Sequence, residues 1–260
     1  PLFELDNIVF TPHLGASTDE AQLAAGTELA RQIAIYLQTG ESINAVNMPS
    51  VSSDELIKLQ PYLVLARRLG NLLGNMVNEP ITQIEVTLSG EASERDKRSI
   101  SVDSLIGLLG TKLSIPVNRV NALSLAGQHG TKLLESARGD HPHYHATVSL
   151  TARHGDKATT VEGALFDRKH PRLVRINDYP IEAVLEGNLL LTRHKDQPGV
   201  VASLSSILAK RHINISSMQV GNVNGADAVA ILGISTPVDA ATMKELAGID
   251  PISQITQVSL

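Results

Sequence analysis

Residues 193–218 read RHKDQPGVVASLSSILAKRHINISSM, which predicts a loop, a helix and a strand in succession. Pro198 and Gly199 stand where the helix begins, and proline favours this place because its fixed φ suits a helix and no N–H is needed there. Apolar residues then recur every three to four positions, the pattern of a helix with one buried face. They are Val200, Val201, Leu204, Ile207 and Leu208. Ile213 and Ile215 then flank Asn214 in an apolar–polar–apolar pattern that predicts a strand.

The start of this helix has the groups that bind a small zwitterion. The helix start leaves backbone N–H groups that have no partner within the helix and that Gly199 makes more approachable, and these groups can bind a carboxylate. Asp196 precedes them and can accept hydrogen bonds from an ammonium group, and His194 lies on the same loop. An amino acid carries both charges. These residues can equally form an ordinary polar loop and strand end, and the pattern alone leaves both interpretations open.

The last part of the chain, residues 187–260, repeats this alternation of elements. The order strand, helix, strand, strand, helix, strand within such a length is typical of a ferredoxin-like βαββαβ domain. We expect strands at residues 188–194, 213–220, 226–234 and 252–258, and helices at 199–211 and 238–246.

Residues 51–186 predict an α+β domain. A long helix is expected to open near Gln60 and Pro61, a strand to run from Gln83 to Ser89, and helices to follow near residues 96–113 and 121–130. After Gly139 the pattern becomes strand-like, at residues 144–151, 159–166, 172–176 and 179–184.

The first part, residues 1–50, has an α/β pattern. Asn7 to Phe10 form an apolar run that predicts a strand buried on both faces. Ser17 or Thr18 can cap a helix that ends at Gly40. His13 lies between strand and helix, where α/β enzymes place their sites, although a loop or capping histidine fits the pattern too. The chain enters this strand almost at once, so we expect a truncated domain.

Composition excludes several classes of function. The 260 residues are 42% hydrophobic and 19% charged, values that are ordinary for a soluble globular protein. A net charge of −5 argues against nucleic acid as a partner, and no apolar run is long enough to cross a membrane. The chain has no cysteine, which excludes disulfides and zinc–thiolate sites and agrees with a reducing cytoplasm.

Two groups in the middle domain invite a functional interpretation. His141, His143 and His145 alternate, so that the last two would share one face of a strand, but without a carboxylate they fit a polar face better than a metal site. We therefore predict no metal. Arg172 belongs to a basic cluster with Arg168, Lys169 and Arg175, which can be an anion site or a solvated turn.

The motif TPHLGAST at residues 11–18, with INAVNMP at residues 43–49, resembles the D-isomer-specific 2-hydroxyacid dehydrogenases, and within them the phosphoglycerate dehydrogenases. The resemblance implies that His13 exchanges a proton with a substrate hydroxyl while hydride passes to NAD. Imidazole suits this role because its pKa lies near neutrality. The family's GxGxxG turn for NAD occurs nowhere in these residues, so this chain alone is not expected to transfer hydride.

The other two parts carry the resemblance onward. ALFDRKHPRLVRI, at residues 164–176, resembles the intervening domain of the longer phosphoglycerate dehydrogenases, which implies a phosphate-like ligand near Arg172. HKDQPGVV with INISSM resembles an ACT domain. The ACT resemblance implies feedback control by L-serine bound at a junction of two ACT domains, with contacts at His194, Asp196, Gly199, Val200 and Asn214. Several relatives have asparagine where this chain has Asp196.

Three functions remain open on the sequence. The first is the C-terminal regulatory part of an NAD-dependent phosphoglycerate dehydrogenase that forms homo-oligomers through paired ACT domains. The second is a free-standing amino-acid sensor in which His13 is vestigial. The third is a module that serves oligomerisation alone.

Overall fold

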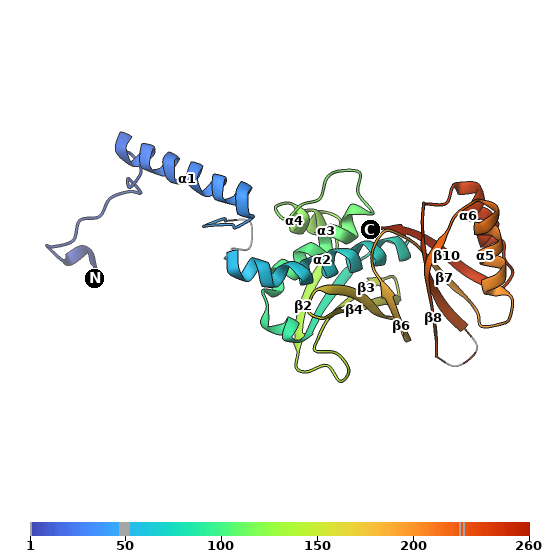
Figure 1. Cartoon of the computed structure of the whole chain (residues 1–260). Coiled ribbons are helices and arrows are strands. Elements are labelled where there is room, and N and C mark those ends of the chain that lie inside the picture. The colour runs from blue at the N-terminus through green and yellow to red at the C-terminus, as the bar shows by residue number, and fades with distance from the viewer. Residues whose placement is uncertain (1, 47–52, 224, 226) are drawn as a thin grey trace. The chain divides into compact units, whose positions relative to one another are not determined.

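The computed structural model describes residues 2–46, 53–223, 225 and 227–260 (Figure 1). The chain divides into two compact units, Pro1–Ile57 and Lys58–Leu260. Its helices, mixed sheet and antiparallel sheet agree with the α+β class predicted for the middle and last parts of the chain.

The first unit is built around helix α1, Asp19–Thr39, which has the predicted ends. The Oγ1 of Thr18 accepts a hydrogen bond from the N–H of Ala21 at 3.2 Å, and Gly40 ends the helix in the left-handed conformation at φ 75°. No residue of α1 is buried, and the Leu23 and Leu37 side chains of its apolar face are 74% and 77% exposed. This helix therefore has correct caps but no packing partner among the described residues of its unit.

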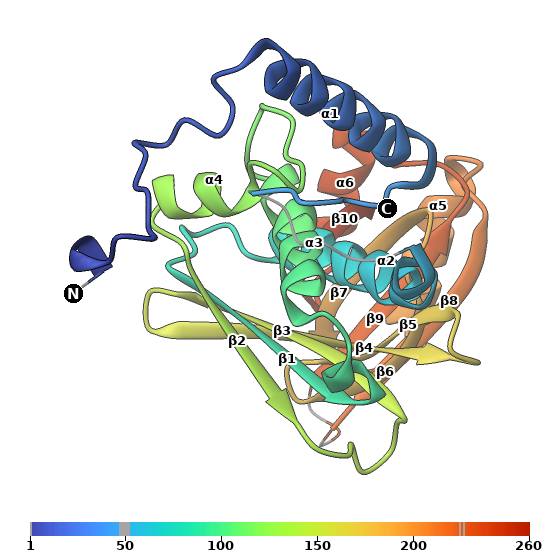
Figure 2. The ribbon, with the colours of Figure 1, turned by 90° about the vertical axis from the view of Figure 1, so that its left-hand side faces the viewer.

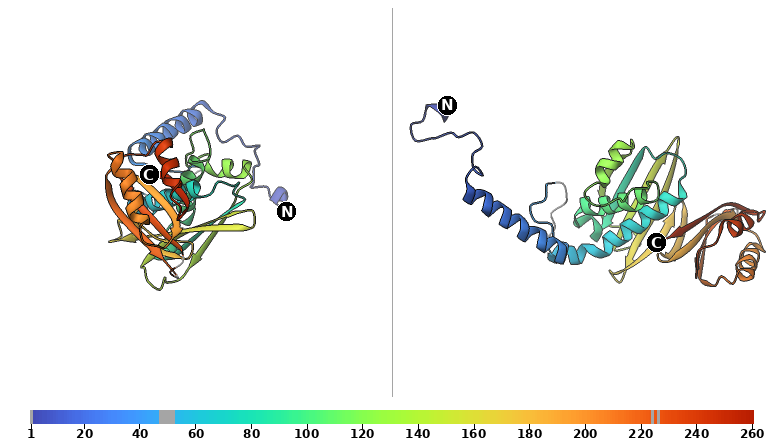
Figure 3. Two further views of the ribbon diagram at one scale, coloured as in Figure 1. Left: turned by 90° about the vertical axis from the view of Figure 1, so that its right-hand side faces the viewer. Right: turned by 90° about the horizontal axis from the view of Figure 1, so that it is seen from above.

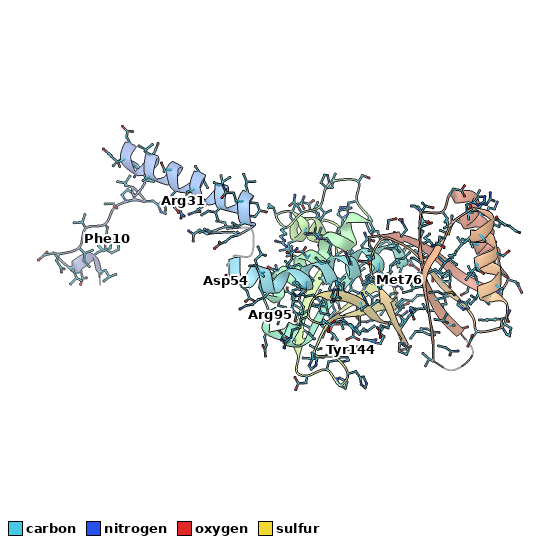
Figure 4. All side chains as sticks on the ribbon, in the orientation of Figure 1. Phe10, Arg31, Asp54, Met76, Arg95 and Tyr144 are labelled. Atoms are coloured by element: carbon cyan, nitrogen blue, oxygen red, sulfur yellow. The ribbon has the colours of Figure 1, made fainter. Side chains whose placement is uncertain are left out.

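The strand predicted at residues 7–10 is wrong. A 3-10 helix, η1, spans Leu2–Glu4, and the residues from Ile8 to Phe10 form no strand. Val9 is 88% exposed, and Phe10 lies against the ring of Phe3 with 4.4 Å between centroids (Figure 4). A strand buried on both faces needs neighbouring strands, and the described residues of this unit provide none. Residues 47–49 of the INAVNMP motif lie outside the described residues.

Helix α2, Ser53–Met76, begins well before the predicted start, so Pro61 lies inside it. An interior proline removes one hydrogen bond and costs about 3 kcal/mol or more. The helix continues through it because the following turns are deeply buried: Leu65, Leu69 and Leu73 are each 0% exposed. Tertiary packing therefore outweighs the local signal.

A six-stranded sheet in the order β2-β1-β3-β4-β5-β6 forms the second layer of this domain. Its strands are β1 Gln83–Gly90, β2 Lys132–Arg138, β3 Ala146–His154, β4 Lys157–Phe166, β5 His170–Ile176 and β6 Tyr179–Val184. Only the β1–β2 pair among them is parallel. Strand β2 was not predicted, because it lies at an edge and its residues are mostly exposed, which removes the apolar alternation that marks a half-buried strand.

Helices α2 and α3 lie on one face of this sheet (Figure 2). The 3-10 helix η2 spans Glu91–Glu94, α3 spans Lys97–Gly110 behind the N-cap Asp96, and α4 spans Ala122–Gln128. The α2 and α3 backbones almost touch: a Cβ at Gly70 would lie 2.1 Å from the carbonyl oxygen of Ser104, and one at Gly107 would lie 2.0 Å from that of Arg67. Only glycine permits this approach.

The prediction that His143 and His145 share one face of a strand is wrong. His141, His143 and His145 belong to the loop between β2 and β3, and the backbone N–H of His143 donates to the Nδ1 of His141 at 3.2 Å. Tyr144, labelled in Figure 4, stacks against His141 with 5.3 Å between ring centroids. This local packing replaces the strand, which begins only at Ala146.

The last domain has the predicted element order, shown in orange and red in Figures 1 and 3. It comprises β7 Asn188–Lys195, α5 Val200–Lys210, β8 Ile215–Asn222, β9 Asp227–Ile234, α6 Ala240–Ala247 and β10 Ile252–Ser259. All neighbours in the sheet β10-β7-β9-β8 are antiparallel. Leu204 and Leu208 of α5 and Leu246 of α6, each 0% exposed, pack with Leu190 and Leu232 of the sheet.

Candidate functional site

His194 lies near the carboxyl end of β7, on the sheet face that the helices cover. It is 3% exposed, and its Nδ1 lies 3.1 Å from the Oγ1 of Thr192. Burial lowers the pKa of His194, and the nearby Asp196 carboxylate acts in the opposite direction. The imidazole is therefore neutral at pH 7 and can offer a neutral donor or acceptor, rather than a charge, to a group beside it.

Asp196 follows on the exposed loop, where the side-chain amide of Asn222 donates a hydrogen bond to its carboxylate. Asn222 ends β8, and its Oδ1 accepts the N–H of Gly225 at 2.7 Å. This partner could not be predicted from the sequence, because Asn222 could be recognised there only as part of a turn. Asn222 holds the carboxylate that we expect to contact an ammonium group.

The first turn of α5 is open. Gly199 is its N-cap at φ 97°, and no side chain caps the helix. A Cβ at Gly199 would meet no atom within 4 Å, so the position requires glycine for its backbone conformation rather than for space. Val200 is 2% exposed and packs into the core, so only its backbone N–H faces a ligand. Uncapped N–H groups and the positive end of the helix dipole favour an anion here.

Asn214 lies at the other end of the same sheet. The next residue, Ile215, pairs with Ile234 of β9, and Ile234 pairs on its other side with Asn188, the first residue of β7. Asn222 aligns through Ala228 with His194. The rise of a strand places the two ends roughly 20 Å apart. The structure thus brings His194, Asp196, Gly199 and Val200 together, and it does not bring Asn214 to them within one chain.

Among the described strands, β8 lies at an edge of its sheet and pairs with β9 alone. Ser216, Ser217, Gln219 and Val220 of this strand are all exposed. An unpaired edge of this kind is a template for a strand from another chain. The free edge lies beside both Asn214 and Asn222, one at each end of the strand.

His13, the predicted catalytic residue, lies in the first unit. It is exposed and has a positive φ of 44°, with its backbone N–H donating to the carbonyl oxygen of Thr11 at 3.1 Å. No described side chain hydrogen-bonds its ring. The residues that orient a catalytic imidazole are therefore not provided by the described part of this unit.

The residues that the structure describes form no dinucleotide-binding turn for NAD. A dinucleotide site needs a glycine-rich turn between a strand and a helix in a parallel βαβ unit. The parallel pair in the described residues, β1–β2, is not joined by such a turn: β1 leads through Gly90 into η2. The described residues also contain no group of three or more histidine, aspartate or glutamate side chains that could hold a metal ion.

Arg172 of β5 lies between Ala164 and Val184 of the neighbouring strands. Its Nη1 donates to the carbonyl oxygen of Pro171 at 3.3 Å, and it forms no ion pair with a described residue. Other members of the basic cluster are neutralised, Arg175 by Glu162 at 2.8 Å and Arg168 by Glu91 at 3.3 Å. Arg172 thus keeps free donors for an anion, whereas Arg168 and Arg175 are engaged.

Comparison with known proteins finds two matched segments in the second unit. Residues 58–177 match the model of the D-3-phosphoglycerate dehydrogenase intervening domain, and residues 188–250 match the ACT domain. The chain carries a phosphoglycerate dehydrogenase intervening domain followed by an ACT domain.

Whole-chain relatives extend the similarity into the first unit. All of this chain is 33% identical to a D-3-phosphoglycerate dehydrogenase of Methanocaldococcus jannaschii and 32% identical to one of Synechocystis sp., and 97% of it is 29% identical to that of Bacillus subtilis. The chain spans about half the length of these relatives, between 47% and 49%. None of the described helices is long and apolar enough to cross a membrane.

Proposed function

We propose that this chain is the C-terminal regulatory part of an NAD-dependent D-3-phosphoglycerate dehydrogenase, which catalyses the first step of L-serine biosynthesis, and that its ACT domain binds L-serine. The parts divide at residues 1–50, 51–186 and 187–260. His13 serves proton transfer only when the whole enzyme supplies NAD and its binding residues. The expected place of such an enzyme is the cytoplasm. The open first turn of α5 beside Asp196 is the observation that carries the proposal.

Each group of serine has a matching group in this cluster. The carboxylate binds the backbone N–H groups at Gly199 and Val200, where the helix dipole favours negative charge. The ammonium binds Asp196, which Asn222 holds in place. His194, neutral and fixed beside Thr192, faces the same end of the sheet. A small side chain is favoured because Val200 is packed into the core and leaves only backbone at the helix start.

The site is completed by a second copy of the chain. Antiparallel pairing of two β8 edges around a two-fold axis places the beginning of one β8 beside the end of the other. Asn214 of one copy then lies near Asp196 and Asn222 of its neighbour. A ligand that contacts both copies binds the paired state more tightly than the separate state, and this difference is what couples it to enzyme activity.

Calorimetric titration with L-serine, glycine and L-alanine tests the proposal. We expect L-serine to bind selectively, and Asp196→Ala and Asn214→Ala each to abolish the selective heat. Gln197→Ala, at an exposed neighbouring position, serves as the matched control and retains binding. Loss of binding in the control as well would show that the variants act through folding.

A mixing experiment separates a shared site from a site within one chain. In a dimer formed from one Asp196→Ala chain and one Asn214→Ala chain, one site carries both substitutions and the other carries neither. Random mixing therefore restores about a quarter of the sites. No recovery after mixing would contradict the shared site, and absence of amino-acid binding by the wild-type chain would favour a module for oligomerisation alone.

Arg172 supports a separate proposal for the intervening domain, a phosphate-like anion held by its free guanidinium donors. Titration of phosphate into wild type and Arg172→Ala tests it, since unchanged binding in the variant would remove Arg172 from the site.

A further inference from the structure

A small hollow lies between α2 and the segment around α3, away from both sites described above. Its volume is about 240 Å³, less than the space that a drug-sized ligand occupies. Charged and polar side chains surround an apolar floor. The residues that form its charged rim and floor are Arg67, Arg68, Arg119, Asp103, Asn71 and Leu63.

Asp103 is buried beneath this hollow at 1% exposure and joins two of the arginines. Its Oδ1 accepts from the Nη2 of Arg67 at 2.5 Å and from the Nε at 3.1 Å, and its Oδ2 accepts from the Nε of Arg119 at 2.9 Å. One arginine is enough to neutralise a buried carboxylate. The second leaves a net positive charge, and the shared carboxylate fixes the orientation of both guanidinium groups.

Both guanidinium groups keep donors for a ligand. Arg119 uses one N–H and Arg67 uses two on Asp103, and the others have no protein acceptor among the described residues. The Arg67 and Arg119 side chains are 52% and 26% exposed, so these donors are reachable from solvent.

Arg68 adds a third positive charge to the hollow. Its one ion pair in the described chain is a long contact of 4.0 Å with Glu186, whose side chain is 67% exposed. An exposed pair at that distance contributes little and leaves Arg68 available. The hollow therefore has three guanidinium groups, one buried carboxylate and a weak external pair.

We propose that this hollow is a binding site for a small organic phosphate, distinct from the site at Arg172. Planar guanidinium groups match the oxygens of a phosphate dianion with paired hydrogen bonds. The floor formed by Leu63, 2% exposed, accommodates a short carbon chain attached to that phosphate.

The site also touches the ACT domain. Leu260, which follows β10, lines the hollow, and its backbone N–H donates to the carbonyl oxygen of Gly187 at 2.9 Å, just before β7. A phosphate bound here contacts α2 and the end of the ACT sheet together. Its occupancy thus favours one arrangement of the two domains of the second unit.

Titration of the whole chain with inorganic phosphate and with glycerol 3-phosphate, at low ionic strength, tests this site. We expect saturable binding of both, with the ester tighter because its carbon chain covers Leu63. Arg68→Gln removes a charged donor without exposing Asp103, and should weaken binding roughly tenfold, the usual effect of losing one charge-assisted hydrogen bond. Arg119→Gln should weaken it at least as much.

Two controls keep the test decisive. Arg98→Gln removes an arginine of α3 that pairs with Glu135 at 3.0 Å outside the hollow, and Arg172→Gln alters the other candidate anion site. Arg98→Gln should bind glycerol 3-phosphate like wild type, and Arg172→Gln should retain the binding that Arg68→Gln weakens. Binding unchanged by Arg68→Gln, or lost in Arg172→Gln, overturns the proposal, as does equal affinity for the two phosphates. L-Serine titration of Arg68→Gln should be normal, which separates this site from the ACT site.

Discussion

The two units of the chain differ in what their apolar side chains touch. In α1 every residue is accessible, and Leu29 and Ile33 of its apolar face are 57% and 49% exposed. In α2 the same residue types are enclosed between α3 and the six-stranded sheet. Helix α1 has sound local signals, whereas α2 contains Pro61, so the contrast shows that a motif and a correctly capped helix do not by themselves make a core. Most of a helix's stability in a protein comes from tertiary packing.

Shortening one leucine in each unit measures this contrast directly. Leu69 of α2 is 0% exposed, so Leu69→Ala should lower the free energy of unfolding by about 3 kcal/mol through lost burial and a cavity. Leu29→Ala in α1 should change it by less than about 0.5 kcal/mol, as surface substitutions do. Urea denaturation followed by far-ultraviolet circular dichroism gives both values. A large effect of Leu29→Ala would show that α1 is packed in solution.

Replacing a glycine by alanine should have opposite effects on stability in the two units. A Cβ at Gly107 of α3 would lie 2.0 Å from the carbonyl oxygen of Arg67 and 2.8 Å from the N of Asn71, so the two helices must separate. Gly107→Ala should therefore cost roughly 1–3 kcal/mol. Gly26 of α1 has nothing within 4 Å of its Cβ position, and Gly26→Ala should favour the helix by about 0.5–1 kcal/mol.

Hydrogen exchange on α1 and the melting temperature of the second unit provide the two measurements. Gly110→Ala, at the end of the same helix α3 but with no atom within 4 Å, is the control for Gly107. Equal effects of the two α3 substitutions would mean that the close helix crossing is absent.

Sequence patterns correctly predicted the features that are determined by residues close together along the chain. The caps of α1, the alternation of β1 and the order of the ACT elements all depend on neighbours along the chain, and these predictions are confirmed. The errors share one cause. Ile8 to Phe10 have strand composition but no neighbouring strand, Pro61 is a helix breaker inside a helix that packing maintains, and β2 is an edge strand with little apolar alternation.

Prediction of the candidate site from sequence is limited in the same way, by contacts between residues that are distant along the chain. The loop and helix start at residues 194–200 are contiguous, so the sequence could group them, and the structure places them together. Asn222 depends on the antiparallel register of β8, and Arg67 and Arg119 meet only through Asp103. Contacts between residues far apart in sequence leave no local pattern. Register also places Asn214 at the opposite end of the sheet from His194, which no spacing along the chain could indicate.

The smallest effect that we predict concerns the two histidines proposed for function, His194 and His13. Burial lowers the pKa of His194 below its ordinary value of 6.5, so the unfolded chain binds more protons than the folded chain as pH falls through 6.5. The stability associated with a neutral His194 is therefore present above pH 6.5 and is lost as pH falls from there towards the folded-state pKa.

His194→Gln should flatten this part of the stability curve, measured by urea denaturation between pH 5 and pH 8, which are about the limits of the histidine range. His13→Gln, at an exposed position of the other unit, should leave the unfolding free energy of the second unit unchanged. A slope that survives in His194→Gln would assign the pH dependence to another group and would mean that His194 is not enclosed in the ACT sheet in solution.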